Sequence, residues 1–246
     1  MAAISGSQLD IGNAGSATIT GTFTPSNTTN YVSGGTVTMT VTVAKATPSF
    51  TWSGVSKTFG DAAFVLTAPS VSGSLPGSWA YATSDTSVVS LSGATATVAG
   101  GGSATITGTF TPTDTANYVS ERTTTMVVAV DRATPTFVWS NVSATFNDAN
   151  ATISAPAASF GGIAVSGSWV YTSSDTAVAA VEAGNTQFDF GNAGTATISG
   201  TFTPSNTTNY VSGGTATMTV TVAKADQTTL TVTSTSGTYG TNLMLT

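Results

Sequence analysis

The 246-residue sequence contains no cysteine and no histidine, and charged side chains make up only 7% of it. The absence of cysteine excludes a disulfide framework and a thiolate metal site. The absence of histidine removes the side chain that most often serves as an acid or base near neutral pH, and the glutamates are limited to Glu121 and Glu182. Serine and aspartate without such a base make no catalytic triad, so we expect no enzyme.

Positive charge and long apolar runs are scarce as well. Five lysine and arginine residues stand against eleven aspartate and glutamate residues, which gives a net charge of −6. Because lysine and arginine carry most of the affinity for phosphates, this balance argues against a nucleic-acid partner. Apolar residues alternate with threonine and serine, and the stretch 126–130 is far too short to cross a bilayer. We therefore expect no membrane insertion.

What the sequence does contain is one block that occurs three times. Residues 12–46 recur at 191–225, and a more diverged copy covers 103–133. The first and last copies differ only at Ser16/Thr195, Thr20/Ser199 and Val37/Ala216. A tyrosine that follows asparagine marks each copy, at Tyr31, Tyr118 and Tyr210. Such a period indicates an array of one structural unit, which builds length and reach and favours a structural or adhesive role.

Alternation along the chain predicts that each unit is built of strands. Ala104, Ile106 and Phe110 alternate with threonines, so the apolar side chains are expected to face a core and the threonines to face water. The last segment of the unit repeats this pattern, with Val37, Met39, Val41 and Val43 separated by threonines. Turn residues recur about every eight to twelve positions, and no segment has helical spacing. Roughly seven short strands per unit predict an all-β fold of antiparallel two-sheet sandwiches.

Short links define the predicted domains. Pro48 and Pro135 mark the entry into a new unit, because proline cannot donate to a strand ladder and biases the preceding residue toward extended geometry. The prediction is a partial domain at 1–46 with C-terminal strands only, complete domains at 47–131 and 132–224, and a partial domain at 225–246 with the first strands only. Links of about four residues leave little slack, so we expect a semi-rigid rod.

Two segments carry a family resemblance. The sequences YATSDTSVVSL at 81–91 and YTSSDTAV at 171–178 are each followed by a glycine-rich turn and then by ATIT or ATIS. They resemble the bacterial immunoglobulin-like domains of the intimin/invasin type (group 2) in large surface proteins. The tail at 230–240 resembles the start of a related module of such proteins. The resemblance implies tandem immunoglobulin-like antiparallel β-sandwiches on a surface, and it implies no catalytic residue.

Four aspartates are the candidate metal ligands, with Ca²⁺ as the ion. They occupy matching places in the two complete units, at Asp61 and Asp148 and at Asp85 and Asp175. Ca²⁺ takes roughly six to eight oxygens, usually with several converging carboxylates, whereas each of these aspartates is single in its loop. Aspartate in a turn commonly bonds its own backbone, so the sequence favours turn chemistry over calcium.

The tryptophans allow another alternative, a platform for stacking sugars. Trp52 lies two residues from Phe50, and Trp79 lies two residues from Tyr81. Residues two apart share one face of a strand, so packing against other side chains in the core is the favoured interpretation.

The repeat and the missing catalytic groups favour a non-enzymatic stalk or fibre segment of an extracellular repeat protein, an adhesin-like spacer at a cell surface or virion surface. The loop 26–35 is identical in two copies, whereas a selective binding loop would gain from diverging. One alternative is a self-assembling filament subunit, joined head-to-tail by strand complementation of the incomplete domains at 1–46 and 225–246. Another is a phage fibre or decoration domain. The expected partners are neighbouring copies of the repeat.

Overall fold

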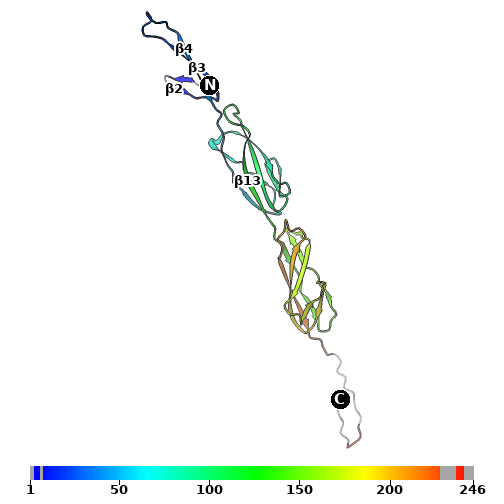
Figure 1. Ribbon diagram of the computed structural model, residues 1–246. Coiled ribbons are helices and arrows are strands. Elements are labelled where there is room, and N and C mark those ends of the chain that lie inside the picture. Colours follow the sequence, from blue (N-terminus) through cyan, green and yellow to red (C-terminus); the bar gives the residue numbers. More distant parts are fainter. Residues whose placement is uncertain (1–2, 6–7, 228–236, 241–246) are drawn as a thin grey trace. The chain divides into compact units, whose positions relative to one another are not determined.

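The computed structural model describes residues 3–5, 8–227 and 237–240, and its regular structure there is almost entirely β-strand (Figure 1). Within these residues the helical structure is limited to one short 3₁₀ turn, η1 (Ser72–Ser74). Contacts divide the chain into two compact units. The first is Met1–Ala133 together with Thr208–Tyr210, and the second is Thr134–Thr207 together with Val211–Thr246. The strands predicted for 225–246 fall largely outside the described residues.

The first unit begins with two hairpins. β1 (Ala3–Ser5) pairs with β2 (Gln8–Asp10), and β3 (Gly15–Phe23) pairs antiparallel with β4 (Gly35–Val43) along its whole length (Figure 1). Within the described part of the chain, β3 and β4 form a sheet of their own with no third strand. Val37 and Met39 are exposed. The prediction that they face a core is therefore wrong for this copy, because no second described sheet covers their face.

The strands from 50 to 131 form a sandwich of two sheets. The larger sheet has the order β6 (Val55–Thr58), β13 (Arg122–Asp131), β12 (Gly102–Pro112) and β9 (Gly77–Thr83). The smaller sheet has the order β10 (Val89–Ser92), β11 (Thr95–Val98) and β7 (Phe64–Val65), and β5 (Phe50–Thr51) pairs with β8 (Ser70–Val71). All pairs are antiparallel except β6 with β13, which is parallel. The first strand of the larger sheet thus lies beside the last.

The core of this sandwich lies between its two sheets. In β12, Ala104, Ile106 and Phe110 are buried and the threonines between them are exposed or half-buried, as the alternation predicts. Val89 and Ala96 of the smaller sheet are also buried in this core. Removing such apolar side chains from water, at about 25 cal/mol per Å², is what holds the two sheets together.

The second unit contains a sandwich of the same design. Its larger sheet has the order β15 (Val142–Thr145), β23 (Thr215–Ala223), β22 (Gly194–Pro204) and β19 (Gly167–Ser173). Its smaller sheets are β16 (Ala151–Thr152), β21 (Gln187–Phe190) and β20 (Ala179–Val181), and β14 (Thr136–Val138), β17 (Ala157–Phe160) and β18 (Ile163–Ala164). β15 pairs parallel with β23, as β6 does with β13. The all-β fold of tandem antiparallel sandwiches is confirmed, whereas the exact domain boundaries stay predictions.

The core of the second sandwich shows where the repeated block is buried. Met218 and Val220 of β23 and Ile198 and Phe202 of β22 are buried, together with Phe188 from the facing sheet. Gly200 of β22 lies directly against aromatic rings, since a Cβ on it would come within 3.0 Å of Trp169 and Tyr171. A side chain at this position would therefore have to displace those rings.

Candidate functional site

Each copy of the repeated block carries a loop with an asparagine-tyrosine pair between its last two strands. We call these the Asn-Tyr loops. They lie at 24–34 between β3 and β4, at 113–121 between β12 and β13, and at 205–214 between β22 and β23. Because these loops recur once in every copy, their contacts show which other parts of the chain the repeat binds.

Local hydrogen bonds give the Asn-Tyr loops their shape. The N–H of Tyr118 donates to the carbonyl oxygen of Asp114 at 3.2 Å, and the N–H of Asn117 donates to Oδ1 of Asp114 at 3.1 Å. In the first loop, the N–H of Tyr31 donates to the carbonyl oxygen of Asn27 at 3.2 Å. Short side chains with an acceptor oxygen favour such turns because they satisfy the loop's own backbone donors.

Asn117 binds two separate stretches of the first unit. Its Oδ1 accepts a hydrogen bond from the N–H of Ala14 at 2.8 Å, in the turn before β3. Its carbonyl oxygen accepts from the N–H of Ala46 at 2.8 Å, and the N–H of Val119 donates back to the carbonyl oxygen of Ala46 at 2.9 Å. One residue therefore holds both the turn that opens the hairpin β3–β4 and the link that follows it.

Charge and further hydrogen bonds support the same contact. Nζ of Lys45 donates to the carbonyl oxygen of Thr115 at 2.7 Å. Nδ2 of Asn117 donates to Oδ2 of Asp114 at 2.7 Å. The side-chain and backbone hydrogen bonds from Asn117, with the positive charge of Lys45 as a smaller contribution, lower the pKa of Asp114. The ionised carboxylate thus orients the asparagine that bridges the two stretches.

Asn209 repeats the contact elsewhere in the first unit. Its Oδ1 accepts from the N–H of Gly101 at 2.8 Å, and its carbonyl oxygen accepts from the N–H of Ala133 at 2.9 Å. Gly101 and Ala133 occupy the places in their copy that Ala14 and Ala46 occupy in theirs. At both loops, the side-chain oxygen and the main-chain carbonyl oxygen of the asparagine therefore accept hydrogen bonds from N–H groups at the same two positions of the repeat.

Tyr210 adds an aromatic contact to this arrangement. Its ring meets the ring of Phe59 edge-on, with centroids 5.4 Å apart and planes at 83°. Such edge-to-face pairs contribute about 0.5–1.5 kcal/mol beyond the area that they bury. The N–H of Phe59 donates to the carbonyl oxygen of Asp131 at 2.8 Å, which holds this residue beside the end of the last strand.

The first pair of candidate metal ligands lies in turns, which is the interpretation that the sequence favours. Oδ2 of Asp61 accepts from the N–H of Thr58 at 2.9 Å, and Oδ2 of Asp148 accepts from the N–H of Thr145 at 2.6 Å. Both carboxylates therefore bond the backbone of the turn in which they stand.

The second pair, Asp85 and Asp175, lies in a different loop of each sandwich. Oδ1 of Asp85 accepts from the hydroxyl of Ser87 at 2.6 Å and from its N–H at 2.8 Å, and these bonds lower the pKa of Asp85. Oδ1 of Asp175 accepts from the N–H of Ala177 at 2.9 Å. The described residues contain no group of three or more acidic side chains placed to hold a metal ion. Calcium at these turns stays a proposal, to be checked by the melting temperature in added calcium.

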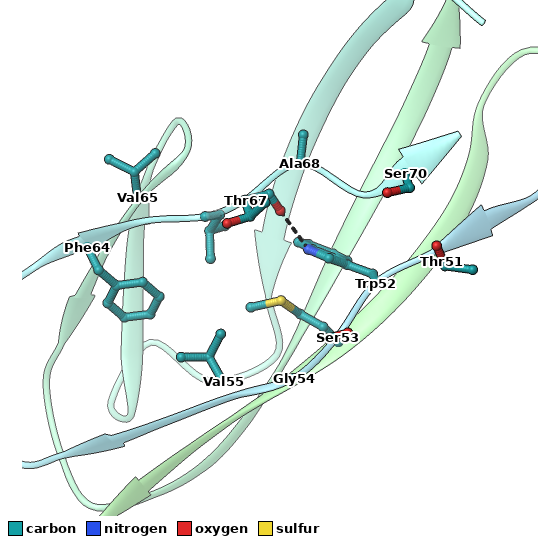
Figure 2. Close-up of a pocket in the computed structure, with 12 residues that line it drawn as sticks. Thr51, Trp52, Ser53, Gly54, Val55, Phe64, Val65, Thr67, Ala68 and Ser70 are labelled. Atoms are coloured by element: carbon teal, nitrogen blue, oxygen red, sulfur yellow. Dashed lines mark hydrogen bonds between the residues drawn. The ribbon is translucent and has the colours of Figure 1, made fainter. Parts of the chain in front are cut away.

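A pocket of about 340 Å³ opens at one side of the first sandwich, and Figure 2 shows its lining. Nε1 of Trp52 donates to the carbonyl oxygen of Thr67 at 2.7 Å across it, and Phe64, Leu66 and Met126 supply apolar walls. All twelve lining residues are uncharged. The pocket can accommodate an apolar group, and it offers no acid, base or charged anchor for chemistry.

The tryptophans lie within clusters of aromatic rings. The ring of Trp79 lies 5.0 Å from those of Phe50 and Phe110, and that of Trp52 lies 5.6 Å from that of Tyr81. Partial burial raises the pKa of the Tyr81 hydroxyl. Rings paired in this way stabilise the sandwich.

No family model matches the sequence, and the search of curated proteins finds no match. Drosophila N-cadherin EC1-4 is similar at 13% identity and a TM-score of 0.33, over 76% of this chain and 52% of that one. Protocadherin gammaB7 EC3-6 is similar at 14% identity and a TM-score of 0.33, over 86% and 58%. The S-layer protein rSbsC(31-844) is similar at 17% identity and a TM-score of 0.32, over 89% and 32%.

The chain thus spans about half of the N-cadherin chain and about a third of the S-layer chain. Identities and TM-scores this low carry no argument about function, and the fold rests on the strand pairing itself. Among the described residues, no helix has the length and apolar character needed to span a membrane.

Proposed function

We propose that the chain is a load-bearing, non-enzymatic spacer of an extracellular repeat protein, a stalk or fibre segment. The observation that carries this proposal is the parallel pairing of the first and last strands in the larger sheet of each sandwich. β6 pairs with β13 from Val55↔Val128 to Thr58↔Asp131, and β15 pairs with β23 from Val142↔Val220 to Thr145↔Ala223.

Parallel terminal strands determine how a pulling force reaches the sheet. When the two chain ends of a sandwich are drawn apart, the force runs along β6 and β13 in opposite directions. All hydrogen bonds between the strands then share the load in shear, whereas in an antiparallel terminal pair they would open one after another. A spacer that holds something away from a surface gains from this arrangement, and a catalytic domain has no use for it.

The Asn-Tyr loops support the same function. Asn117 and Asn209 each bind a glycine-rich or alanine-containing turn and a link segment through two backbone donors. Contacts repeated with the period of the sequence stiffen an array without recognising any outside ligand. The surface exposure and the bacterial immunoglobulin-like family type that the sequence motifs imply belong to this proposal.

Force spectroscopy on single chains tests the load-bearing function. We expect two resisted unfolding events, each releasing about 300 Å of chain, which is the length of one extended sandwich. Replacing both Ser56 and Lys57 by proline removes a backbone donor from β6, because the N–H groups of neighbouring strand residues point to opposite sides. The first sandwich should then lose its resistance, while the second serves as the internal control.

Two outcomes would count against the spacer. One is unfolding of both sandwiches of the unaltered chain without resistance, which would remove the mechanical argument. The other is micromolar affinity of these sandwiches for a particular glycan or protein, which would make the chain a recognition module.

The hairpin β3–β4 favours a second candidate function, a filament subunit that accepts strands from a partner copy. Val37 and Met39 present an apolar face that strands of another chain could cover in the manner of strand complementation. Substituting Met39 by serine should then abolish assembly, which sedimentation would show. A phage fibre domain would share the spacer's mechanics, and finding the chain on purified virions would identify it.

A further inference from the structure

The pocket beside Trp52 reaches down to the core of the first sandwich. Its volume of about 340 Å³ lies at the lower end of the range for small-molecule sites, about 300–1,000 Å³. Leu66 and Met126 line the pocket and also belong to the core cluster, with exposed fractions of 4% and 5%. A ligand in this pocket would therefore lie directly against apolar atoms of the core.

Two aromatic rings form walls of the pocket, and both are held in place. Figure 2 shows the ring of Phe64 on one side and the indole of Trp52 on the other. Nε1 of Trp52 donates to the carbonyl oxygen of Thr67 at 2.7 Å. Nζ of Lys57, which does not line the pocket, lies 4.7 Å from the centroid of the Phe64 ring, a cation–π contact. Because these contacts already orient the rings, a ligand would not have to order them, and this favours binding.

The matching strand pair of the second sandwich places its phenylalanine differently. Phe64 of β7 pairs with Ala96 of β11, whereas Ala151 of β16 pairs with Phe188 of β21. Phe188 is 1% exposed and belongs entirely to the core, but Phe64 is only half-buried. Each pair thus contains one phenylalanine. In the first sandwich it stands on the strand that borders the pocket, and part of its surface stays accessible to a ligand.

Gly54 keeps another side of the pocket free of side-chain atoms. At the same position the second sandwich has Asn141, whose Oδ1 accepts from the N–H of Thr219 at 2.9 Å. Val127 corresponds to Thr219, because β6 pairs with β13 in the same register as β15 with β23. Its N–H therefore points toward Gly54, which has no side chain to accept from it. The backbone thus offers a donor at the edge of the pocket for an acceptor atom of a ligand.

The lining also determines the charge and shape of a suitable ligand. None of the twelve lining residues is charged, so an ion would lose its hydration without a partner that replaces it. Rings such as those of Trp52 and Phe64 pair favourably with another ring. Water against apolar walls is poorly held, and an apolar group displaces it with a gain in affinity. A neutral, flat ligand therefore fits the pocket best.

From this lining we infer that the pocket binds a small neutral aromatic molecule that carries an oxygen acceptor, of the chemical class of the phenols. Its ring lies between Trp52 and Phe64, and its oxygen accepts from the N–H of Val127. A ligand of about eight non-hydrogen atoms makes few contacts, so the expected dissociation constant is about 1 mM. The inference goes beyond the proposed spacer function and does not depend on it.

An NMR titration of the full chain with p-cresol, between about 0.1 and 10 mM, tests this inference. At pH 7 this phenol is neutral, because phenolic hydroxyls of the tyrosine type have a pKa of about 10. The indole N–H signal of Trp52 and the amide signal of Val127 should shift and approach saturation together. The indole N–H of Trp139, which donates to the carbonyl oxygen of Ser154 at 2.6 Å in the second sandwich, is the internal control and should not shift.

Two variants introduce the residues of the second sandwich into the pocket. Phe64→Ala removes one aromatic wall and should weaken p-cresol binding by about tenfold. Gly54→Asn supplies the acceptor that Asn141 supplies in the second sandwich, so it should compete for the N–H of Val127 and weaken binding as well. Phe146→Ala removes a phenylalanine that is 41% exposed in the second unit, and it is the matched control that should bind like the unaltered chain.

The choice of probe tests the chemistry of the ligand. Toluene lacks the oxygen and should bind more weakly than p-cresol, and equal binding would overturn the assignment of an acceptor. Tighter binding of N-acetyl-tyrosinamide than of p-cresol would assign the ring to a partner protein and overturn the small-molecule ligand. The inference also fails if the signals of Trp52 and Val127 do not move at 10 mM p-cresol, or if Phe64→Ala and Gly54→Asn both bind without loss.

Discussion

The hairpins β3–β4 and β22–β23 have almost the same sequence and very different surroundings. Residues 12–46 and 191–225 differ at three positions, yet Met39 is 57% exposed and its counterpart Met218 is 3% exposed. β22 and β23 are flanked by β19 and β15, and a facing sheet covers their apolar side. β3 and β4 pair only with each other among the described residues.

This difference shows that the register of a hairpin follows from its own sequence, whereas the burial of its side chains depends on the neighbouring sheets. Both hairpins have the same register, with Gly15 opposite Val43 and Gly194 opposite Val222. Alternating threonine and apolar residues and a shared loop are thus enough to pair two strands. Stability must come from the facing sheet, because paired strands with an open apolar face remove little surface from water.

Truncating the same phenylalanine in both copies should give the largest difference. Phe202 is 1% exposed and Phe23 is 68% exposed. Phe202→Ala should lower the free energy of unfolding of the second sandwich by about 3–5 kcal/mol, because it leaves a cavity. Phe23→Ala should change stability by less than about 0.5 kcal/mol, as is usual at the surface. Urea denaturation read from amide signals of the hairpin β3–β4 and of the second sandwich measures both, and equal losses would contradict the comparison.

Adding a methyl group should produce a smaller difference of the same kind. The Cβ of Gly200→Ala would meet Trp169 and Tyr171 at 3.0 Å, so we expect a loss of about 1–3 kcal/mol from overpacking. The Cβ of Gly21→Ala would meet only Val37, at an ordinary 3.5 Å. That variant should be neutral or slightly more stable, since alanine restricts the unfolded chain. Denaturation midpoints compare the two, and a destabilised Gly21→Ala would show that the hairpin is covered.

These contrasts explain how far the sequence predicts the fold. Alternation correctly placed Ala104, Ile106 and Phe110 in a core. The same rule was wrong for Val37, because alternation tells which face of a strand is apolar and not whether a second sheet lies opposite it. The facing sheet is contributed by residues distant in the sequence, and no local pattern in β4 reports on them.

The candidate site was harder to predict than the fold. The sequence marked the Asn-Tyr pair as a landmark of the repeat, but it assigned it no role. Asn117 binds Ala14 across 103 positions and Asn209 binds Gly101 across 108, so neither partner can be read from local spacing. The available signal was the asparagine itself, a side chain with an acceptor oxygen that is present at the same place in all three copies. The aspartates in turns were easier, because they bond residues two or three positions away.

Removing the amide of a docked loop should have a moderate and local effect. Asn117→Ala deprives the N–H of Ala14 of its acceptor, so the exchange of that amide with solvent should accelerate by about tenfold, which corresponds to about 1.4 kcal/mol. Asn30→Ala is the matched control in the exposed loop and should leave the exchange at Ala14 unchanged. Hydrogen exchange followed by NMR measures both variants. Unchanged exchange in Asn117→Ala would mean that the contact is absent in solution.

The smallest expected effect is a pH dependence confined to one of the three loops. The folded-state pKa of Asp114 is lowered by its hydrogen bonds with Asn117 and by Lys45, so its contribution to stability is present above the unfolded pKa, about 3.9. That contribution is lost as the pH falls through the folded-state value, because protonation removes the charge that orients Asn117. Asn27 and Asn206 occupy the same position in the other loops and do not titrate. Exchange at Ala14 should therefore accelerate further in acid, beyond the intrinsic change of a free amide, and Asp114→Asn should abolish this extra dependence. If the extra pH dependence survives in Asp114→Asn, another titrating group causes it. The three loops would then respond alike to acid.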